Sequence, residues 1–213
     1  MEDFLRSSGP GVHVVLGNEA CDLDSMVSSL AFAYFLSKVG SGEALALPLL
    51  NIRQSELVLR SDIIFLLRQT GLSPDLLLFR DQLDLRALHQ AGRLQLTLVD
   101  HNILPSSDRD LEAAVVQVID HHHLERSPSP SCPVTVEMVG SCTTLVTEHI
   151  IQKAPQILDL QLAQLLYGMH LDSQYASALE TQFPALPLRG ALFVELQNAK
   201  FDISGEFRSL TCT

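Results

Sequence analysis

The stretch VHVVLGNEACDLDS, residues 12–25, sets the expected fold. It opens with a short apolar run that ends at Gly17, a pattern that predicts a buried strand. From Asp24 to residue 38 the chain is rich in apolar residues and good helix formers, which predicts a buried helix with Asp24 or Ser25 as its cap. A buried strand, a polar loop and a buried helix in this order indicate an α/β unit.

The same alternation continues along the chain. Apolar runs predict further strands at residues 44–50, 76–79, 94–99, 115–119 and 134–139. Helical patterns occupy residues 61–70, 83–90, 111–114, 141–152 and 160–169. The expected fold class is therefore α/β, with a mostly parallel sheet flanked by helices.

Acidic residues follow three of the predicted strands. Asp22 and Asp24 come after the first strand, Asp100 follows residues 94–99, and Asp120 follows residues 115–119. Because ligands of parallel α/β sheets lie beyond the carboxyl ends of the strands, these side chains are expected to converge on one site. An Asp-x-Asp-Ser sequence is also a common helix start, so the first cluster is open between a metal site and a helix cap.

Histidines accompany two of these aspartates, in VDHN at residues 99–102 and in IDHHH at residues 119–123. Carboxylates with one or two imidazoles suit Mn²⁺, Mg²⁺ or Co²⁺ better than a thiolate-rich zinc site does. Two such ions about 3.5–4 Å apart can hold a phosphoryl oxygen and make a bridging hydroxide at neutral pH. The alternative for the histidine run is a solvated turn before a loop rich in proline and serine.

Composition narrows the class of protein. The 213 residues are 46% apolar, enough for a substantial core, and the net charge of −11 argues against a nucleic-acid backbone as the main partner. The chain has no apolar run long enough for a membrane span and no signal-peptide pattern at its start. Its four cysteines lack Cys-x-x-Cys spacing, which is typical of the reduced thiols of a cytoplasmic protein.

Taken together, these motifs resemble those of the DHH phosphoesterase superfamily, which includes family II inorganic pyrophosphatases, RecJ-type nucleases and Prune exopolyphosphatases. The resemblance covers residues 12–172, and within the superfamily the chain is most similar to the Prune group. The segments that carry this likeness are VHVVLGNEACDLDSMVS, VDHNIL, IDHH and VGSCTTLVTE. The resemblance implies a phosphohydrolase that uses two divalent metal ions, Mn²⁺ or Mg²⁺ with Co²⁺ as a further candidate. Its substrate would be short-chain polyphosphate or a cyclic nucleotide.

The resemblance also implies roles for individual residues. Asp22 and Asp24 would be ligands of separate metals, Asp100 would bridge both ions, and His121 would be a further ligand. His122 would contact phosphate or act as an acid, so that His122 and Asp100 are the expected catalytic residues.

Other positions support the site or depart from the family pattern. Asp120 would be a supporting carboxylate, and the role of His101 is open. Asn18 stands where the pyrophosphatases have a metal-binding histidine, which weakens one metal site. The segment GSCTT at residues 140–144 precedes a predicted helix and is either an ordinary helix cap or an anion-binding helix start.

At the C-terminal end of the region that resembles the family, the role of one expected ligand stays open. Asp172 has the spacing of the family's last metal ligand, but the chain continues directly into SQYASALETQFPALP, without the residues that Prune proteins carry between. Asp172 is therefore either a ligand, an imitation left by an internal deletion, or a surface residue after a helix.

The expected domain organisation is a DHH-type metal-binding phosphoesterase domain at residues 1–172, followed at 173–213 by a linker and the truncated start of the C-terminal region. The family's second domain, whose Arg and Lys residues bind phosphate, would be absent or only begun. Two functions follow: a phosphohydrolase, or a catalytically weak truncated form that acts as a regulatory or protein-binding module. The expected partners are a phosphate-containing small molecule and protein partners like those of Prune proteins, with no membrane.

Overall fold

The computed structural model describes residues 11–40, 42, 44–125 and 132–167. Their strands form one sheet in the order β2-β1-β3-β4-β5, in which every neighbouring pair is parallel. The strands are β1 (Gly11–Leu16), β2 (Ala44–Leu49), β3 (Leu94–Val99), β4 (Val115–Asp120) and β5 (Val134–Val136). The predicted α/β class with a parallel sheet is confirmed, and the strand order reverses between β1 and β3, where α/β proteins bind their ligands.

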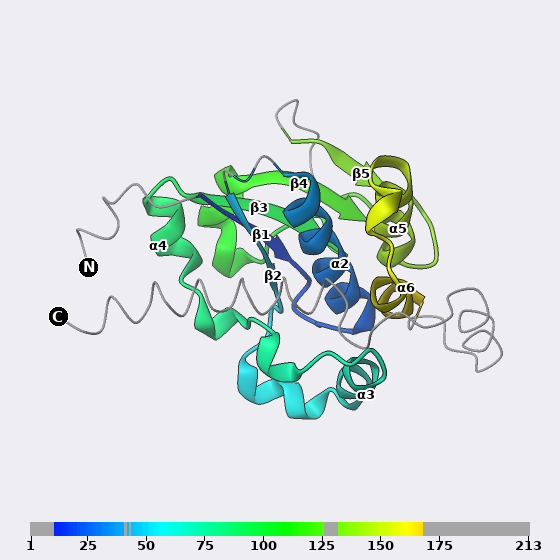
Figure 1. Cartoon of the computed structure of the whole chain (residues 1–213). Helices are drawn as coiled ribbons and strands as arrows, with labels where there is room; N and C mark the ends of the chain where they lie inside the picture. The colour runs from blue at the N-terminus through cyan, green and yellow to red at the C-terminus, as the bar shows by residue number, and fades with distance from the viewer. Residues whose placement is uncertain (1–10, 41, 43, 126–131, 168–213) are drawn as a thin grey trace.

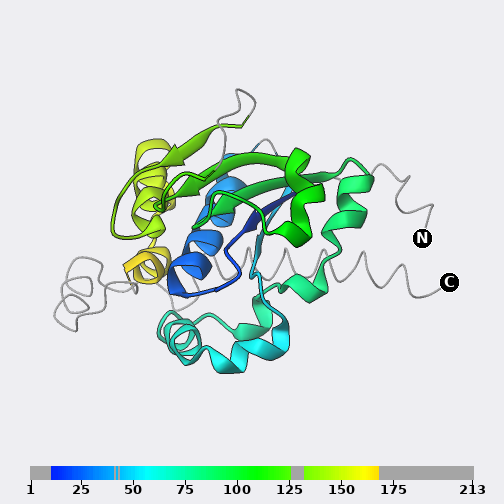
Figure 2. The same ribbon diagram turned by 180° about the vertical axis from the view of Figure 1, so that it is seen from behind.

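Helices cover both faces of this sheet, as Figures 1 and 2 show from opposite sides. One layer contains α2 (Leu23–Val39), α5 (Cys142–Lys153) and α6 (Leu160–Tyr167), and the other contains α4 (Leu85–Gln90) and η4 (Ser106–Ala114). The remaining helices are α3 (Ser61–Gln69), η1 (Gln54–Leu59), η2 (Pro74–Leu76), η3 (Arg80–Gln82) and η5 (Pro155–Ile157). None of the described helices is long and apolar enough to cross a membrane.

Two apolar cores lie on opposite sides of the sheet. Successive side chains of a strand point to opposite faces, so Val15 packs against the layer of α2 while Val14 and Leu16 pack in the other core. Helix α2 is itself buried along residues 24–35. This double burial explains why β1 is an almost continuous apolar run and why α2 carries apolar residues on several faces.

The predicted strand at residues 76–79 is wrong. Pro74 opens the short helix η2, and Ser73 caps it by accepting a hydrogen bond from the backbone N–H of Asp75. Only an isolated bridge between Leu50 and Phe79 joins this region to the sheet. Three of these four apolar residues are buried in the two cores of the protein, so the pattern indicated burial and not strand pairing.

Smaller differences concern where elements begin and end. The helix expected at residues 111–114 is the last part of the longer 3₁₀ helix η4, and the strand expected at residues 134–139 ends at Val136. Neither Asp24 nor Ser25 caps α2, because Asp22 accepts the hydrogen bond from the backbone N–H of Ser25. Cys21, Cys132 and Cys142 are buried free thiols, and Cys212 lies outside the described residues.

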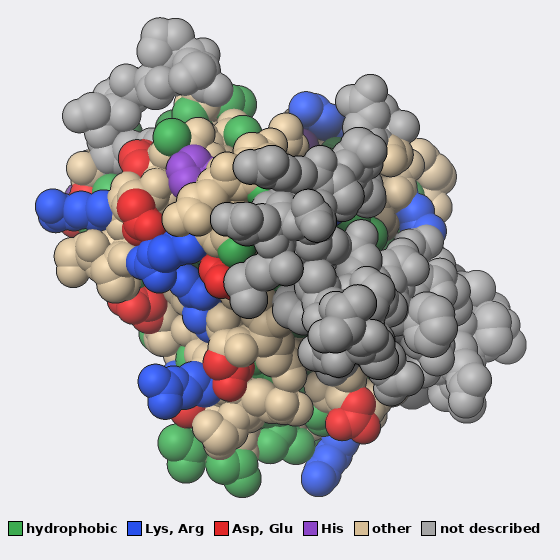
Figure 3. Space-filling model, turned by 90° about the vertical axis from the view of Figure 1, so that its left-hand side faces the viewer, with side chains coloured by type: hydrophobic (Ala, Val, Ile, Leu, Met, Phe, Trp, Pro, Cys, Tyr) green, Lys and Arg blue, Asp and Glu red, His purple; other side chains and the backbone are tan. Residues whose placement is uncertain are grey.

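Basic and acidic side chains are interspersed on the face shown in Figure 3. A network of ion pairs joins α4 to η4, because Arg86 contacts both Asp108 and Asp110, at 3.1 and 2.8 Å. Asp108 is buried and also accepts a hydrogen bond from Arg80 at 3.2 Å. These contacts fix the layer opposite α2.

Candidate metal centre

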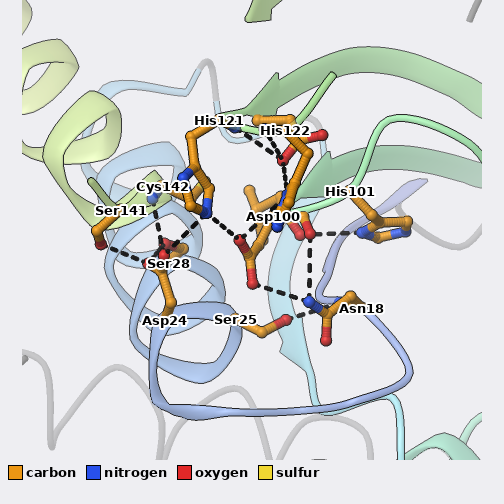
Figure 4. A network of polar contacts seen from close by, with 12 residues as sticks. Asn18, Asp24, Ser25, Ser28, Asp100, His101, His121, His122, Ser141 and Cys142 are labelled. Atoms are coloured by element: carbon orange, nitrogen blue, oxygen red, sulfur yellow. Dashed lines mark hydrogen bonds and ion pairs between the residues drawn. The ribbon is translucent and has the colours of Figure 1, made fainter. Parts of the chain in front are cut away.

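The polar residues that follow β1, β3 and β4 lie at one edge of the sheet, against the start of α5 (Figure 4). Asp24 is in the first turn of α2, Asp100 directly follows β3, and His121 directly follows β4. Parallel strands that end at the same edge bring these three side chains together even though they are far apart in the sequence.

Asp100 is held in an unusual backbone conformation. Its φ is +63°, in the left-handed region that costs most residues about 1–3 kcal/mol but that Asp tolerates better than others. Its backbone N–H donates to the carbonyl of Ile119 at 3.0 Å, and its carboxylate is almost completely buried. Within the described residues, Oδ2 accepts a hydrogen bond from Asn18 at 2.8 Å, whereas Oδ1 accepts none.

His121 faces that unbonded oxygen. Its Nδ1 lies 3.0 Å from the carbonyl of Val139, and because a carbonyl only accepts, Nδ1 carries the proton in the neutral ring. Nε2 then presents its lone pair, 3.2 Å from Asp100 Oδ1 and 3.5 Å from Asp24 Oδ2. Three lone-pair atoms facing one another require a cation between them, either a proton, on Nε2 or on a carboxyl oxygen, or a metal ion.

Asp24 is oriented by the N-terminus of α5. Its Oδ1 accepts hydrogen bonds from the hydroxyls of Ser141 and Thr143 and from the backbone N–H of Thr143, at 2.8, 2.6 and 2.9 Å. Its Oδ2 accepts the backbone N–H of Cys142 at 2.8 Å. A carboxylate at a helix N-terminus is favoured by the exposed N–H groups and by the helix dipole. Oδ2 is thereby directed towards His121.

Residues 140–144 had been open between a helix cap and an anion site, and the structure shows both features. Ser141 caps α5 by accepting a hydrogen bond from the backbone N–H of Thr143, at 3.1 Å. The anion at this helix N-terminus is the carboxylate of Asp24.

Burial and crowding make the ionised form of Asp100 costly. Desolvation, followed by the negative charges of Asp24 and Asp22, raises the pKa of Asp100 to about 8. Burial also raises the pKa of the Cys142 thiol well above its usual value, and its Sγ donates to the carbonyl of Ile119. The converging donors are therefore carboxylate oxygens and an imidazole nitrogen without a thiolate, a set that fits a hard divalent ion.

His122 is oriented by Asp120, which is fully buried. Oδ1 of Asp120 lies 2.8 Å from His122 Nδ1 and accepts the backbone N–H of His121, while Oδ2 accepts from Asn102 at 2.6 Å. Burial alone would raise the pKa of Asp120, but these hydrogen bonds outweigh it and hold the pKa below its usual value. The ionised carboxylate fixes the proton of His122 on Nδ1 and leaves Nε2 for other contacts.

His122 also lies near these candidate metal ligands. Asp100, His121 and His122 form a cluster whose ligand-type atoms lie within 4.8 Å of one another. The His122 atom nearest to Asp100 Oδ1 is Nδ1, at 3.9 Å, and this nitrogen already contacts Asp120. His122 is thus placed as an oriented imidazole beside the donors, with its side chain 56% exposed.

Comparison with known proteins places this arrangement in a family. Residues 13–168 match the family described as "DHH family, N-terminal domain". This chain belongs to the DHH family. It is 50% identical over 227 residues to exopolyphosphatase PRUNE1 of Mus musculus and 49% identical over 227 residues to that of Homo sapiens. Each alignment covers 96% of this chain and 50% of the relative, so the chain spans about half the length of these curated relatives.

A more distant relative and a solved structure are also similar to this chain. A putative exopolyphosphatase of Schizosaccharomyces pombe is 32% identical over 160 residues, which cover 75% of this chain and 41% of that protein. The fold resembles a putative family II inorganic pyrophosphatase of Methanococcus jannaschii, with a TM-score of 0.52 and 21% identity over 92% of this chain and 56% of that chain. At this identity the likeness shows the shared fold.

Only some of the site residues expected from the DHH resemblance lie close together among the described residues. Asp24, Asp100 and His121 converge, and His122 lies beside them. Asp22 is exposed and caps α2, although it is near enough to raise the pKa of Asp100. Asp172 lies outside the described residues.

Several contacts of this DHH site were not anticipated, although residues 140–144 had been singled out. Ser141 and Thr143 orient Asp24, Asn102 holds Asp120, and the carbonyl of Val139 sets the tautomer of His121. Small hydroxyl residues at the start of a helix are a recognisable signal for hydrogen bonding, but only for the helix itself. No pattern in the sequence pairs residues 141–143 with Asp24 more than 100 positions away.

Proposed function

We propose that this chain provides the metal centre of a divalent-metal-dependent phosphohydrolase, and that its substrate is short-chain polyphosphate. The observation that carries the proposal is the convergence of Asp24 Oδ2, Asp100 Oδ1 and His121 Nε2. In the neutral form of His121 with its proton on Nδ1, Nε2 offers a lone pair to this cluster and not a proton. The names of the mammalian and yeast relatives, which are exopolyphosphatases, support the choice of substrate.

The donor set favours Mn²⁺ or Mg²⁺, with Co²⁺ as a further candidate, because two carboxylate oxygens and one imidazole contain no soft ligand. When bound, the ion supplies positive charge to phosphate oxygens and makes water more acidic. The chain carries a net charge of −11, so a polyphosphate anion needs such a local positive charge to bind here. The metal requirement and the acidic composition are therefore compatible.

His122 is the residue proposed to move a proton. Asp120 holds its Nδ1, so Nε2 is the atom that takes a proton from water or gives one to the leaving phosphate. Its side chain is 56% exposed, which allows contact with a substrate entering from solvent. Asp24 and Asp100 are buried, and they hold the ion rather than exchange protons with the substrate.

The test is phosphate release from tripolyphosphate by the wild-type chain, with Mn²⁺ or Mg²⁺ and in the presence of a chelator. Hydrolysis should require the metal and should be lost in His121→Gln. The matched control is His123→Gln, because the neighbouring His123 is exposed and contacts Asn102 through its backbone carbonyl, which the substitution keeps.

Two results would redirect this proposal. Hydrolysis of a cyclic nucleotide in place of tripolyphosphate would move the substrate class to phosphodiesters, the second substrate expected from the family resemblance. Metal binding without hydrolysis of either substrate would favour the regulatory or protein-binding form.

A further inference from the structure

The two oxygens of the Asp100 carboxylate have different surroundings, as Figure 4 shows. Oδ1 faces His121 Nε2 at 3.2 Å and accepts no hydrogen bond within the described residues. Oδ2 faces Asn18, whose Nδ2 donates to it at 2.8 Å. One oxygen is thus directed at an atom that also lacks a proton in the neutral ring, and the other faces a hydrogen-bond donor.

The side-chain amide of Asn18 is fixed in this orientation by its own partners. Its Oδ1 accepts the backbone N–H of Cys21 at 2.9 Å, so the oxygen end of the amide points away from Asp100. Its Nδ2 donates to Asp100 Oδ2 and to the Asp100 carbonyl oxygen, at 2.8 and 3.2 Å. A carbonyl oxygen only accepts hydrogen bonds, so turning the amide over would place two acceptors against each other and two donors against each other.

The backbone of Asn18 is held as well. Its N–H donates to the hydroxyl of Ser25 at 2.7 Å. The amide therefore cannot swing aside without breaking several partly buried hydrogen bonds at once, and each contributes about 0.5–1.5 kcal/mol.

An amide NH₂ group cannot bind a cation, because it has two donor hydrogens and carries partial positive charge. An ion beside Asp100 Oδ2 would have to displace the Asn18 NH₂ group, and the hydrogen bond from Asn18 to Asp100 would be lost. Asp22, the residue expected to hold a second ion, uses one oxygen, Oδ1, to accept the backbone N–H of Ser25 at 3.0 Å. Among the described residues, the Asn18 side of Asp100 therefore presents a donor group where a second ion would need a ligand.

From this asymmetry we infer that the chain holds one resident divalent ion, between Asp24, Asp100 and His121, and that Asn18 closes the second position that a two-metal centre would use. The inference rests on the metal dependence in the proposed function and differs from the two-ion centre expected from the family resemblance. On the His121 side the ion neutralises Asp100, and on the other side the Asn18 amide takes the place of an ion as the partner of the carboxylate.

The first test is the stoichiometry of the wild-type chain. The protein is equilibrated with Mn²⁺, separated from free metal by gel filtration and analysed for metal content, and a calorimetric titration measures the affinities. We expect one ion per chain and a single binding transition. Two ions with comparable affinities would overturn the inference. The absence of any bound ion would overturn the proposed function too, so the two failures are distinguishable.

The second test changes Asn18 itself. Asn18→Asp replaces the NH₂ group by an oxygen of nearly the same size, and it should add a second equivalent of Mn²⁺. In the matched control, Asn18→Ala, the hydrogen bond is removed without adding a ligand, and one equivalent should remain. A folded Asn18→Asp chain that still binds one ion would show that Asn18 does not close the second position. If the variant does not fold, the wild-type stoichiometry decides.

Discussion

Thr143 and Asp24 lie 119 residues apart in the chain, yet the backbone N–H and the hydroxyl of Thr143 both donate to Asp24 Oδ1, at 2.9 and 2.6 Å. The hydroxyl of Ser28 lies 3.3 Å from the same Thr143 hydroxyl, so α2 and α5 share one buried polar contact. Because Oδ1 is fully engaged in this way, Oδ2 is left to face His121. The start of α5 therefore determines the orientation of a carboxylate on another helix.

Thr143→Val tests this orientation. Valine has nearly the same shape as threonine but lacks the hydroxyl, so Asp24 loses one donor and its orientation weakens. A hydrogen bond to a charged group contributes about 1.5–3 kcal/mol, and we expect a loss of unfolding free energy in that range. Mn²⁺ affinity should fall about tenfold, the equivalent of about 1.4 kcal/mol. Urea unfolding in chelator and calorimetry with Mn²⁺ measure the two effects. Thr143→Ser keeps the hydroxyl and should retain most of the affinity, and equal losses in both variants would contradict the assigned role.

The parallel sheet could be predicted because strands buried on both faces and the helices between them leave strong apolar patterns. The convergence of Asp100 and His121 could be expected for the same reason, since both follow strands that end at one edge of the sheet. The role of the Asp-x-Asp motif was harder to predict, because its spacing is common at a helix start and is also compatible with a metal site. The structure divides these roles: Asp22 caps α2, and Asp24 turns towards His121.

Contacts between distant segments could not be predicted from local patterns. The hydrogen bond from Asn18 to Asp100 joins residues 82 positions apart, and it depends on how β1 and β3 pair. The apolar run at residues 76–79 was misassigned for a related reason. A short apolar run indicates that a segment is buried, but whether it pairs as a strand depends on its neighbours in the fold.

Asp100→Asn should separate stability from metal binding. The oxygen of the new amide can still accept from Asn18, while its NH₂ can donate to the lone pair of His121 Nε2. Asn also tolerates the left-handed backbone found here, at φ +63°. The metal-free protein should therefore become about 1–3 kcal/mol more stable, because a buried acceptor without a hydrogen bond is removed.

The same substitution should abolish the metal response. Wild type should show a thermal unfolding temperature that rises with Mn²⁺ concentration, because the ion binds the folded state, and Asp100→Asn should show no such rise. Asp100→Ala is the control, since it loses the metal ligand without gaining the hydrogen bonds and should be destabilised in chelator. Undiminished Mn²⁺ binding by Asp100→Asn would exclude Asp100 as a ligand.

A separate prediction concerns acid stability and His13, a partly buried residue of β1. Its Nε2 lies 2.8 Å from the Thr97 hydroxyl, and burial holds the pKa of His13 below its usual value of 6.5. The unfolded chain therefore binds a proton at a higher pH than the folded chain does. Stability from this group is present above pH 6.5 and is lost as the pH falls from 6.5 through the folded pKa.

His13→Gln removes this titration and retains groups that can bond to Thr97. The unfolding free energy of the variant should fall less steeply than that of wild type as the pH is lowered below 6.5. Thr97→Val keeps His13 and should retain the steep dependence. Denaturant unfolding at a series of pH values measures both slopes, and parallel curves for wild type and His13→Gln would disprove the contribution of His13.

The adjacent residues His121 and His122 should lose activity for different reasons when each is changed to glutamine, one through metal affinity and the other through kcat. His121→Gln removes a nitrogen that faces Asp24 and Asp100, so Mn²⁺ affinity should fall by at least about 10–100-fold, the loss seen when even supporting residues of metal sites are changed. Part of the activity of His121→Gln should return at high Mn²⁺.

His122→Gln leaves those donors in place but removes the proton carrier held by Asp120. Its kcat should therefore fall about 10²–10⁴-fold with little change in Mn²⁺ affinity, and added metal should not restore kcat. Calorimetry and tripolyphosphate hydrolysis over a range of Mn²⁺ concentrations measure both variants beside His123→Gln. If His122→Gln lost metal as readily as His121→Gln, His122 would be a ligand, and another residue would have to move the proton.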